Sequence, residues 1–170
     1  TRHTAVGLSA LATNTTAIRN TAIGYQALTA NTTGAQNTAV GDISMYTNTT
    51  GADNTAIGGS ALGANTTGSN NVAVGRLSLD ANTTADNNTA VGYDSLGANT
   101  TGHSNTAVGK RALFTNATSN NNTAIGYLAL EANTTGGNTA VGGQALQANS
   151  TGEANVAVGQ AALIANTTGS

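Results

Sequence analysis

Residues 20–36 read NTAIGYQALTANTTGAQ, and this 17-residue unit recurs along the whole 170-residue chain. Its most regular landmark is a glycine that follows Val or Ile. This glycine is found at Gly7, Gly24, Gly41, Gly58, Gly75, Gly92, Gly109, Gly126, Gly142 and Gly159, in steps of 17 residues and once of 16. A short fixed period is the sequence signature of a solenoid, in which each repeat packs against its neighbours.

The one short copy indicates which part of the unit is a turn. Residues 135–138, TGGN, have one residue fewer than the equivalent residues 33–37, TGAQN. A residue lost from a strand would move the following side chains to the opposite face, whereas a turn absorbs the loss. The Asn-Thr-Thr-Gly region is therefore predicted to be a turn.

Two short strands per unit are predicted between these turns. Thr-Ala-Val/Ile, rich in β-branched residues, is the first, and x-Ala/Ser-Leu-x is the second, with the intervening Gly as the bend. Alternation along a strand places Thr55 and Ile57 on one side and Ala56 on the other. Val replaces Thr at Val72 and Val156, which favours an inward direction for the Thr and Val/Ile side chains.

One large apolar residue per unit is predicted to fill the interior. The position holds Leu11, Leu28, Met45, Leu62, Leu79, Leu96, Leu113, Leu130, Leu146 and Leu163. These residues should stack into one internal column. The composition allows little else, because only 7% of the residues are charged and 3% are aromatic, with no Cys, Pro or Trp.

The energy balance of one coil favours association between chains. Ordering its backbone costs about 1–2 kcal/mol per residue, which one Leu, one Val/Ile and the ladder hydrogen bonds barely offset. The Ala of the first strand, the same in every unit, is predicted to face outward and to form the inter-chain contact. The residues concerned are Ala5, Ala22, Ala39, Ala56, Ala73, Ala90, Ala107, Ala124, Ala140 and Ala157.

Residues 71–75, NVAVG, and 155–159, NVAVG, resemble the head-repeat motif of YadA-type trimeric autotransporter adhesins. The Ala-Leu-x-Ala-Asn-Thr-Thr-Gly pattern also resembles repeats of phage tail-fibre proteins. The resemblance implies an all-β fold, a left-handed parallel β-solenoid (β-roll) of ten 16- or 17-residue coils in a trimer. It also implies a structural or adhesive extracellular fibre on a cell surface or a virion, with a host-surface glycan or protein as a further partner.

Residues 1–170 are interpreted as a single repeat domain and a fragment of a longer fibre. The five basic residues are dispersed along the chain, so nucleic acid is not an expected partner. Its apolar runs are far shorter than the roughly 20 residues of a membrane-spanning helix, so no membrane insertion is expected in this segment.

No constellation of residues points to an enzyme. His3 and His103 lie about six coils apart, and the seven acidic residues occupy variable positions of the unit. We therefore expect no catalytic residue, no cofactor and no metal site. Tyr25, Tyr93 and Tyr127 share the position after the Gly, which is predicted to be exposed and to decorate the surface.

The turn of each unit also contains an Asn-x-Thr sequence, the acceptor pattern for N-linked glycans. The asparagines are Asn14, Asn31, Asn48, Asn65, Asn82, Asn99, Asn116, Asn133, Asn149 and Asn166. Two interpretations remain open: the asparagines cap the turns and form amide ladders between coils, or they carry sugars on a glycan-coated filament. A third function, ice binding through aligned threonines, is disfavoured if the regular threonines point inward or lie in turns.

Overall fold

The computed structural model describes residues 2–170, which form one stack of coils with a three-residue strand in each repeat. No helix occurs in this part of the chain. The strands are β1 (Thr4–Val6), β2 (Thr21–Ile23), β3 (Thr38–Val40), β4 (Thr55–Ile57), β5 (Val72–Val74), β6 (Thr89–Val91), β7 (Thr106–Val108), β8 (Thr123–Ile125), β9 (Thr139–Val141) and β10 (Val156–Val158).

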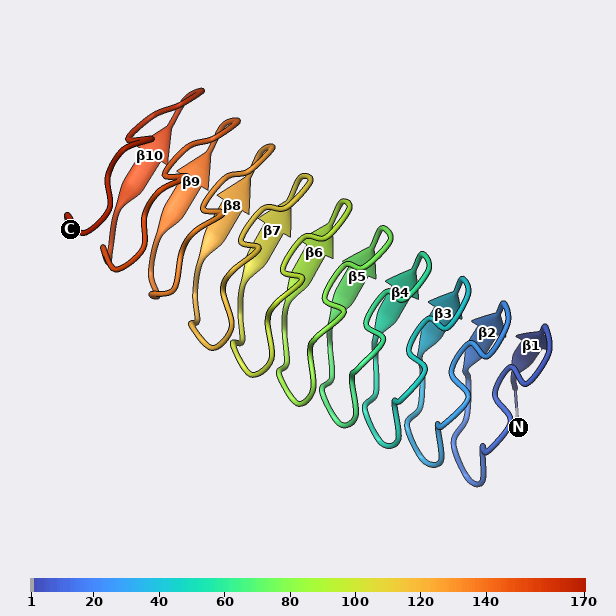
Figure 1. Ribbon diagram of the computed structural model, residues 1–170. Helices are drawn as coiled ribbons and strands as arrows, with labels where there is room; N and C mark the ends of the chain where they lie inside the picture. Colours follow the sequence, from blue (N-terminus) through green and yellow to red (C-terminus); the bar gives the residue numbers. More distant parts are fainter. Residues whose placement is uncertain (1) are drawn as a thin grey trace.

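The strands form one parallel sheet in which neighbours in the sequence are neighbours in space. Its order is β1 to β10 without a crossover, and equivalent residues pair directly, as Ala56 does with Ala73. Figure 1 shows the successive coils stacked along one axis, with all strands on the same side. The predicted all-β parallel solenoid is confirmed.

The glycine after each strand is required by both conformation and space. Gly75 has φ 131°, a region that L side chains rarely adopt. A Cβ atom on Gly75 would lie 2.6 Å from the carbonyl oxygen of Gly92 in the next coil. The bend predicted at this position is confirmed, and its glycine column allows the backbones of adjacent coils to approach closely.

The second predicted strand is absent. The Ala-Leu segment of each coil forms turns instead, because Gln26 and Leu28 lie in the left-handed region with φ 52° and 54°. This segment still bonds from coil to coil, as the N–H of Leu28 donates to Ser44 O at 2.9 Å. The coils are thus connected on this side without a β-ladder.

The predicted direction of the first strand's side chains is wrong. In β4 the Ala56 side chain is fully buried, Thr55 is half-buried and Ile57 is 42% exposed. The strand thus turns Ala toward the interior and its two β-branched residues outward. Its narrow coil already contains a Leu and a second Ala or Ser on the opposite wall, which leaves room only for a methyl group.

The proposed inter-chain contact through the strand alanines is therefore incorrect. Ala22, Ala39, Ala56, Ala73, Ala90, Ala107, Ala124 and Ala140 are 0% exposed within a single chain, and Ala157 is 3% exposed. Only Ala5, in the terminal strand β1, is exposed. Methyl groups enclosed by their own coil cannot contact another chain.

The large apolar residues form the predicted internal column. From Leu28 to Leu146 each of them is fully buried, and they cluster with the alanines of both walls. Leu163 is 52% exposed because the last coil has no coil beyond it among the described residues. The core is thus one large side chain wide.

The asparagine that precedes each strand forms a second buried column beside this core. Asn37, for example, is completely buried. Its N–H donates to Asn20 Oδ1 at 2.8 Å, and its Nδ2 donates to Gly51 O at 2.8 Å. Each such asparagine satisfies backbone groups that the short strand leaves unpaired.

Candidate functional site

The asparagines of the Asn-x-Thr sequences lie inside the stack. Eight of them are 0% exposed, namely Asn31, Asn48, Asn65, Asn82, Asn99, Asn116, Asn133 and Asn149. Asn14 and Asn166, in the terminal coils, are partly buried. The acceptor atoms at the eight buried positions are inaccessible to a glycosyltransferase.

Hydrogen bonds occupy these amide groups. Asn48 Nδ2 donates to Asn31 Oδ1 at 2.9 Å and to Gly51 O of its own turn at 3.0 Å. The column begins at Asn14 and ends at Asn166, since Asn31 Nδ2 donates to Asn14 Oδ1 and Asn166 Nδ2 donates to Asn149 Oδ1. It has one break, at Asn116, whose Oδ1 has no hydrogen-bond partner among the described residues. The amide-ladder interpretation is confirmed, and a glycan at the eight buried positions would be incompatible with the folded stack.

The two residues after the turn asparagine, both Thr in most coils, have different environments. The first is partly buried, and its hydroxyl donates to the next coil, as Thr66 Oγ1 does to Thr83 O at 3.0 Å. The second is exposed in most coils, and Thr67 is typical in that its hydroxyl has no hydrogen-bond partner among residues 2–170. Nothing in the packing explains why the second position is Thr in all nine turns of regular length.

Apolar side chains are exposed along the outer side of the sheet, here called the outer face. It consists of the first and third residues of strands β1 to β10. The third residues are Val6, Ile23, Val40, Ile57, Val74, Val91, Val108, Ile125, Val141 and Val158. They form one continuous apolar row along the stack, beside a row of Thr with Val72 and Val156 in two strands.

The outer face is uncovered in the single chain. Ile23, Ile57 and Ile125 are 38%, 42% and 40% exposed. The hydroxyls of the strand threonines, such as Thr89, make no hydrogen bond to any residue that the structure describes. A row of this length with exposed β-branched residues is typical of an interaction surface.

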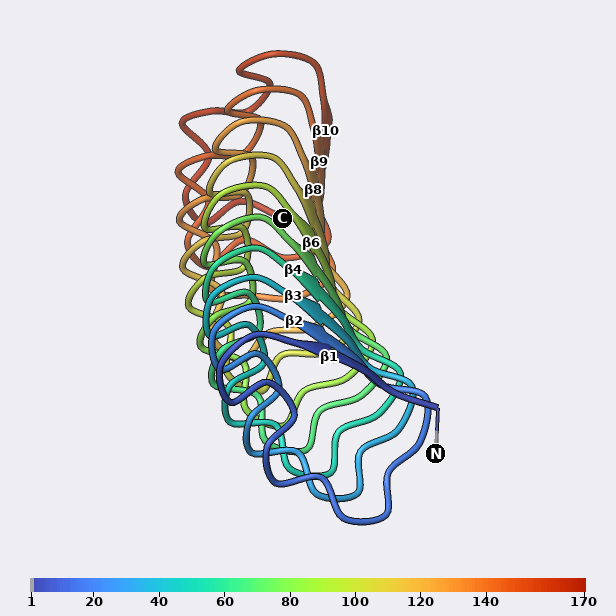
Figure 2. The ribbon, with the colours of Figure 1, turned by 90° about the vertical axis from the view of Figure 1, so that its right-hand side faces the viewer.

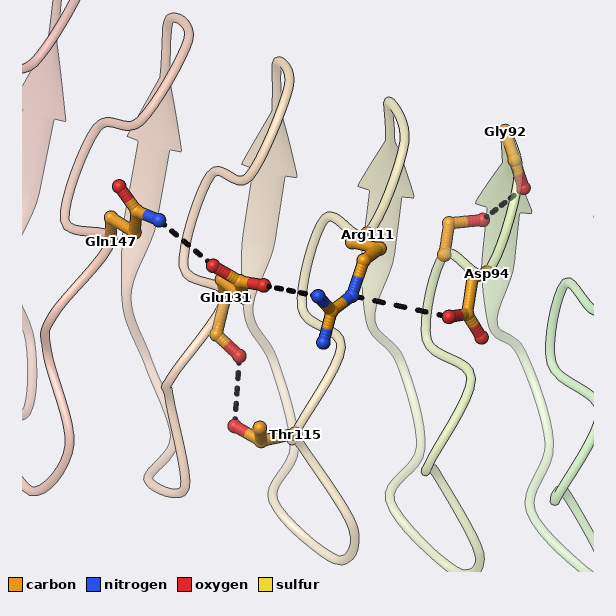
Figure 3. A network of polar contacts seen from close by, with 7 residues as sticks. Gly92, Asp94, Arg111, Thr115, Glu131 and Gln147 are labelled. Carbon is orange, nitrogen blue, oxygen red and sulfur yellow. Dashed lines mark hydrogen bonds and ion pairs between the residues drawn. The ribbon is translucent and has the colours of Figure 1, made fainter.

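A second group of side chains crosses the coils on the wall opposite the strands. Arg111 Nη1 lies 3.1 Å from Glu131 Oε1, and Arg111 Nε lies 4.0 Å from Asp94 Oδ2 (Figure 3). Gln147 Nε2 donates to Glu131 Oε2 at 2.8 Å. The Arg111 guanidinium also stacks 4.0 Å from the ring centre of Phe114. This network connects four consecutive coils and therefore stabilises their stacking.

One carboxyl group near this network has an altered acidity. Burial raises the pKa of Asp80 above its ordinary value, and the Asp94 carboxylate raises it further, whereas Arg76 acts in the opposite direction. The Asp80 side chain lies against Gly63 of the preceding coil, where a Cβ would be 2.6 Å from Asp80 Oδ1. Asp80 is thus held where its charged form is poorly solvated.

The remaining candidate groups do not converge. His3 contacts Asn14 and Asn20, whereas His103 contacts Ser104. Across residues 2–170 there is no group of three or more His, Cys, Asp or Glu side chains that could bind a metal ion. Tyr25, Tyr93 and Tyr127 are 49%, 42% and 52% exposed, as predicted, and Lys110 Nζ lies 5.9 Å from the Tyr93 ring centre.

Within its described residues, the chain also has no helix long and apolar enough to cross a lipid bilayer. Comparison with protein-family models, curated proteins and solved structures finds no match to this chain.

Proposed function

We propose that this chain is a non-catalytic segment of an extracellular fibre that associates with identical chains through the outer face. The observation that carries the proposal is the apolar row on β1 to β10, which extends along the whole stack and is uncovered in one chain. The fibre would act as the head or shaft of a cell-surface adhesin or of a phage tail fibre.

The period of the outer face indicates which surface could cover it. Its side chains repeat once per strand, at about 4.8 Å along the stack. A surface that matches this spacing over ten strands must itself repeat at the same interval, and a second copy of the chain does so. In-register association would bury Val/Ile rows against each other without leaving strand hydroxyls in an apolar environment, because the Thr row lies to one side.

The number of chains is proposed from the resemblance to YadA-type heads, which implies a homotrimer. Figure 2 shows that the strand direction turns progressively from β1 to β10, so the outer face winds around the rod. Chains whose outer faces wind in this way could stay in contact along their length by coiling about a common axis. A glycan or a protein on a host surface is the further partner that an adhesive fibre of this kind would bind.

Ice binding is the second candidate, because the strand threonines point outward instead of inward. Their row is regular in β1 to β4 and in β6 to β9. The winding seen in Figure 2 opposes this function, since an ice plane is flat and would contact only a few coils at once. Thermal hysteresis of a dilute solution, with sucrose-matched buffer as control, would reveal it.

The experiment for self-association is sedimentation of the wild-type chain and of two matched double variants. Wild type should sediment at three times the 16.5 kDa chain mass. Val91→Asp with Val108→Asp adds two carboxylates to the outer face and should release monomers, because desolvating these charges opposes burial. Thr84→Asp with Thr101→Asp adds the same charges to exposed turn positions and should remain assembled.

A wild-type chain that sediments as a monomer at tens of micromolar would overturn the proposal. Equal loss of assembly in the turn variant would also contradict it, because the effect would then arise from charge and not from the outer face.

A further inference from the structure

The turn side of the stack has an open cavity of about 420 Å³ beside the short repeat. Its walls come from three consecutive turns: residues 119–121, residues 134–137 and Glu153. No other irregularity of this kind interrupts the repeat, which has one 16-residue step in the entire sequence. The cavity is called the notch below.

The missing residue creates the notch by shortening one turn. In the preceding coil, Asn116 Nδ2 donates to the carbonyl of Ser119, three residues on, at 2.9 Å. In the short coil, Asn133 Nδ2 donates to the carbonyl of Thr135, two residues on, at 2.6 Å. Thr135 thus takes the backbone position of Ser119, and the exposed second threonine of the turn is the residue that is lost.

The short turn also breaks the asparagine column. Asn99 Oδ1 accepts a hydrogen bond from Asn116 Nδ2, but Asn116 Oδ1 is buried and has no partner in the described chain. Thr134 O, which the regular pattern would pair with backbone N–H groups, accepts from the Ser119 hydroxyl instead. The two turns that form the notch are therefore less tightly connected than their neighbours, and Gly136 and Gly137 allow the shorter one to adjust.

The lining specifies the chemistry of a ligand. The hydroxyls of Ser119, Thr134 and Thr135 already donate within the stack, so they offer acceptor lone pairs to a ligand. The side-chain amides of Asn120 and Asn121 add N–H donors. Glu153 adds one carboxylate, and among the described residues no cationic side chain lines the notch or forms an ion pair with Glu153. The Glu153 carboxylate would repel an anion, and an apolar molecule would pair with neither this carboxylate nor the amide N–H groups of Asn120 and Asn121.

We propose that the notch binds one ring of a neutral or amino sugar. Sugar hydroxyls also donate and accept hydrogen bonds, and the volume lies within the range of small-molecule sites, about 300–1,000 Å³. An amino group on the ring would pair with the Glu153 carboxylate. If the chain is part of an adhesive fibre, this sugar would be the group that the fibre recognises on a host surface. The sugar site rests on the proposed function only for this biological role.

The test is titration of the ¹⁵N-labelled wild-type chain with glucose, galactose and glucosamine, each followed by amide chemical shifts. Shifts confined to residues 119–121, 134–137 and 153 are expected, with glucosamine the tightest. Glu153→Gln should weaken glucosamine binding about threefold to tenfold and leave glucose unchanged, since it removes the charge and retains a hydrogen-bonding group. Asp86→Asn is the matched control, because Asp86 has the same place in a regular turn.

A second variant inserts one Thr between Thr134 and Thr135 and so restores the 17-residue unit. It should close the notch and abolish the shifts for all three sugars. Wild-type spectra that do not respond to any of these sugars, or shifts that persist after the insertion, would overturn the proposal. These spectra report on the three turns that line the notch, so they distinguish failure of the sugar site from failure of chain association, which sedimentation measures.

Discussion

Asn65 Nδ2 donates to Asn48 Oδ1 at 2.8 Å, and both side chains are completely buried. Asn65 also donates to Gly68 O at 2.9 Å and accepts from Asn82 Nδ2 at 2.9 Å. One amide thus holds its own turn and connects it to the coils on both sides. In a stack whose strands are only three residues long, these amides replace part of the ladder.

Asn65→Ala should therefore destabilise the chain by about 2–4 kcal/mol, since it leaves buried amide groups of the adjoining coils unpaired. Thr67→Ala, two residues away on the exposed side of the turn, should change stability by less than about 0.5 kcal/mol. Chemical denaturation of both variants measures the difference. Equal stability of the two variants would show that the asparagine column contributes little.

Secretion from a eukaryotic host should yield folded protein without N-linked glycans at the buried acceptors. A sugar on Asn65 Nδ2 could not coexist with its two donated hydrogen bonds. Peptide mapping of the folded fraction should find the eight buried turn asparagines, from Asn31 to Asn149, unmodified. A folded, protease-resistant fraction with glycans mapped to Asn65 or Asn82 would contradict the buried column.

Ala73→Leu should overpack the interior of each chain and lower stability by about 1–3 kcal/mol per site. Because the Ala73 methyl lies inside its own coil, the folded variant should keep the wild-type number of chains per particle. Thermal unfolding and sedimentation together check this prediction. Loss of assembly with unchanged unfolding of the single chain would favour an interface at the alanines.

Gly75→Ala should cost more than about 1 kcal/mol, because a side chain is strained at φ 131° and its Cβ would contact the Gly92 backbone. Gly59→Ala is a suitable control, as its nearest contact with an added Cβ is 4.0 Å away. The two midpoints of thermal unfolding should differ clearly. Similar midpoints would mean that the coils can separate enough to admit a methyl group.

Asp80→Asn should stabilise the protein near pH 7 and have little effect near pH 3. Burial and Asp94 raise the pKa of folded Asp80 above its ordinary value of 3.8. The contribution of this group to stability is therefore complete below its unfolded pKa and is lost as the pH rises through its folded pKa. Denaturation at both pH values gives the comparison, and a variant less stable than wild type at pH 7 would contradict the direction.

Much of the architecture was predictable because a solenoid is defined by its period. The glycine spacing indicated one coil per unit, and the shorter copy at residues 135–138 located the turn. The Leu28 to Leu146 column followed from one large apolar residue in each unit. The Ala-Leu strand was predicted wrongly because the left-handed conformations of Gln26 and Leu28 have no signature in residue type; neither is Gly or Asn.

The candidate site was less predictable for a related reason. Residues 133–138 show that a residue is missing, but not that a cavity opens there. Asn-x-Thr is compatible with both an exposed acceptor and a buried ladder. Only the contact between Asn31 and Asn48 distinguishes them.

The sequence by itself determined that equivalent residues stack in register, because a constant period leaves each residue beside its own copy. It did not determine which side of Thr-Ala-Val faces inward, since alternation separates two faces without orienting them. The tertiary structure decided this: the Leu column and the second wall occupy most of the narrow interior, so the strand contributes only the Ala methyl. The β-branched residues of the same strand consequently form the outer face.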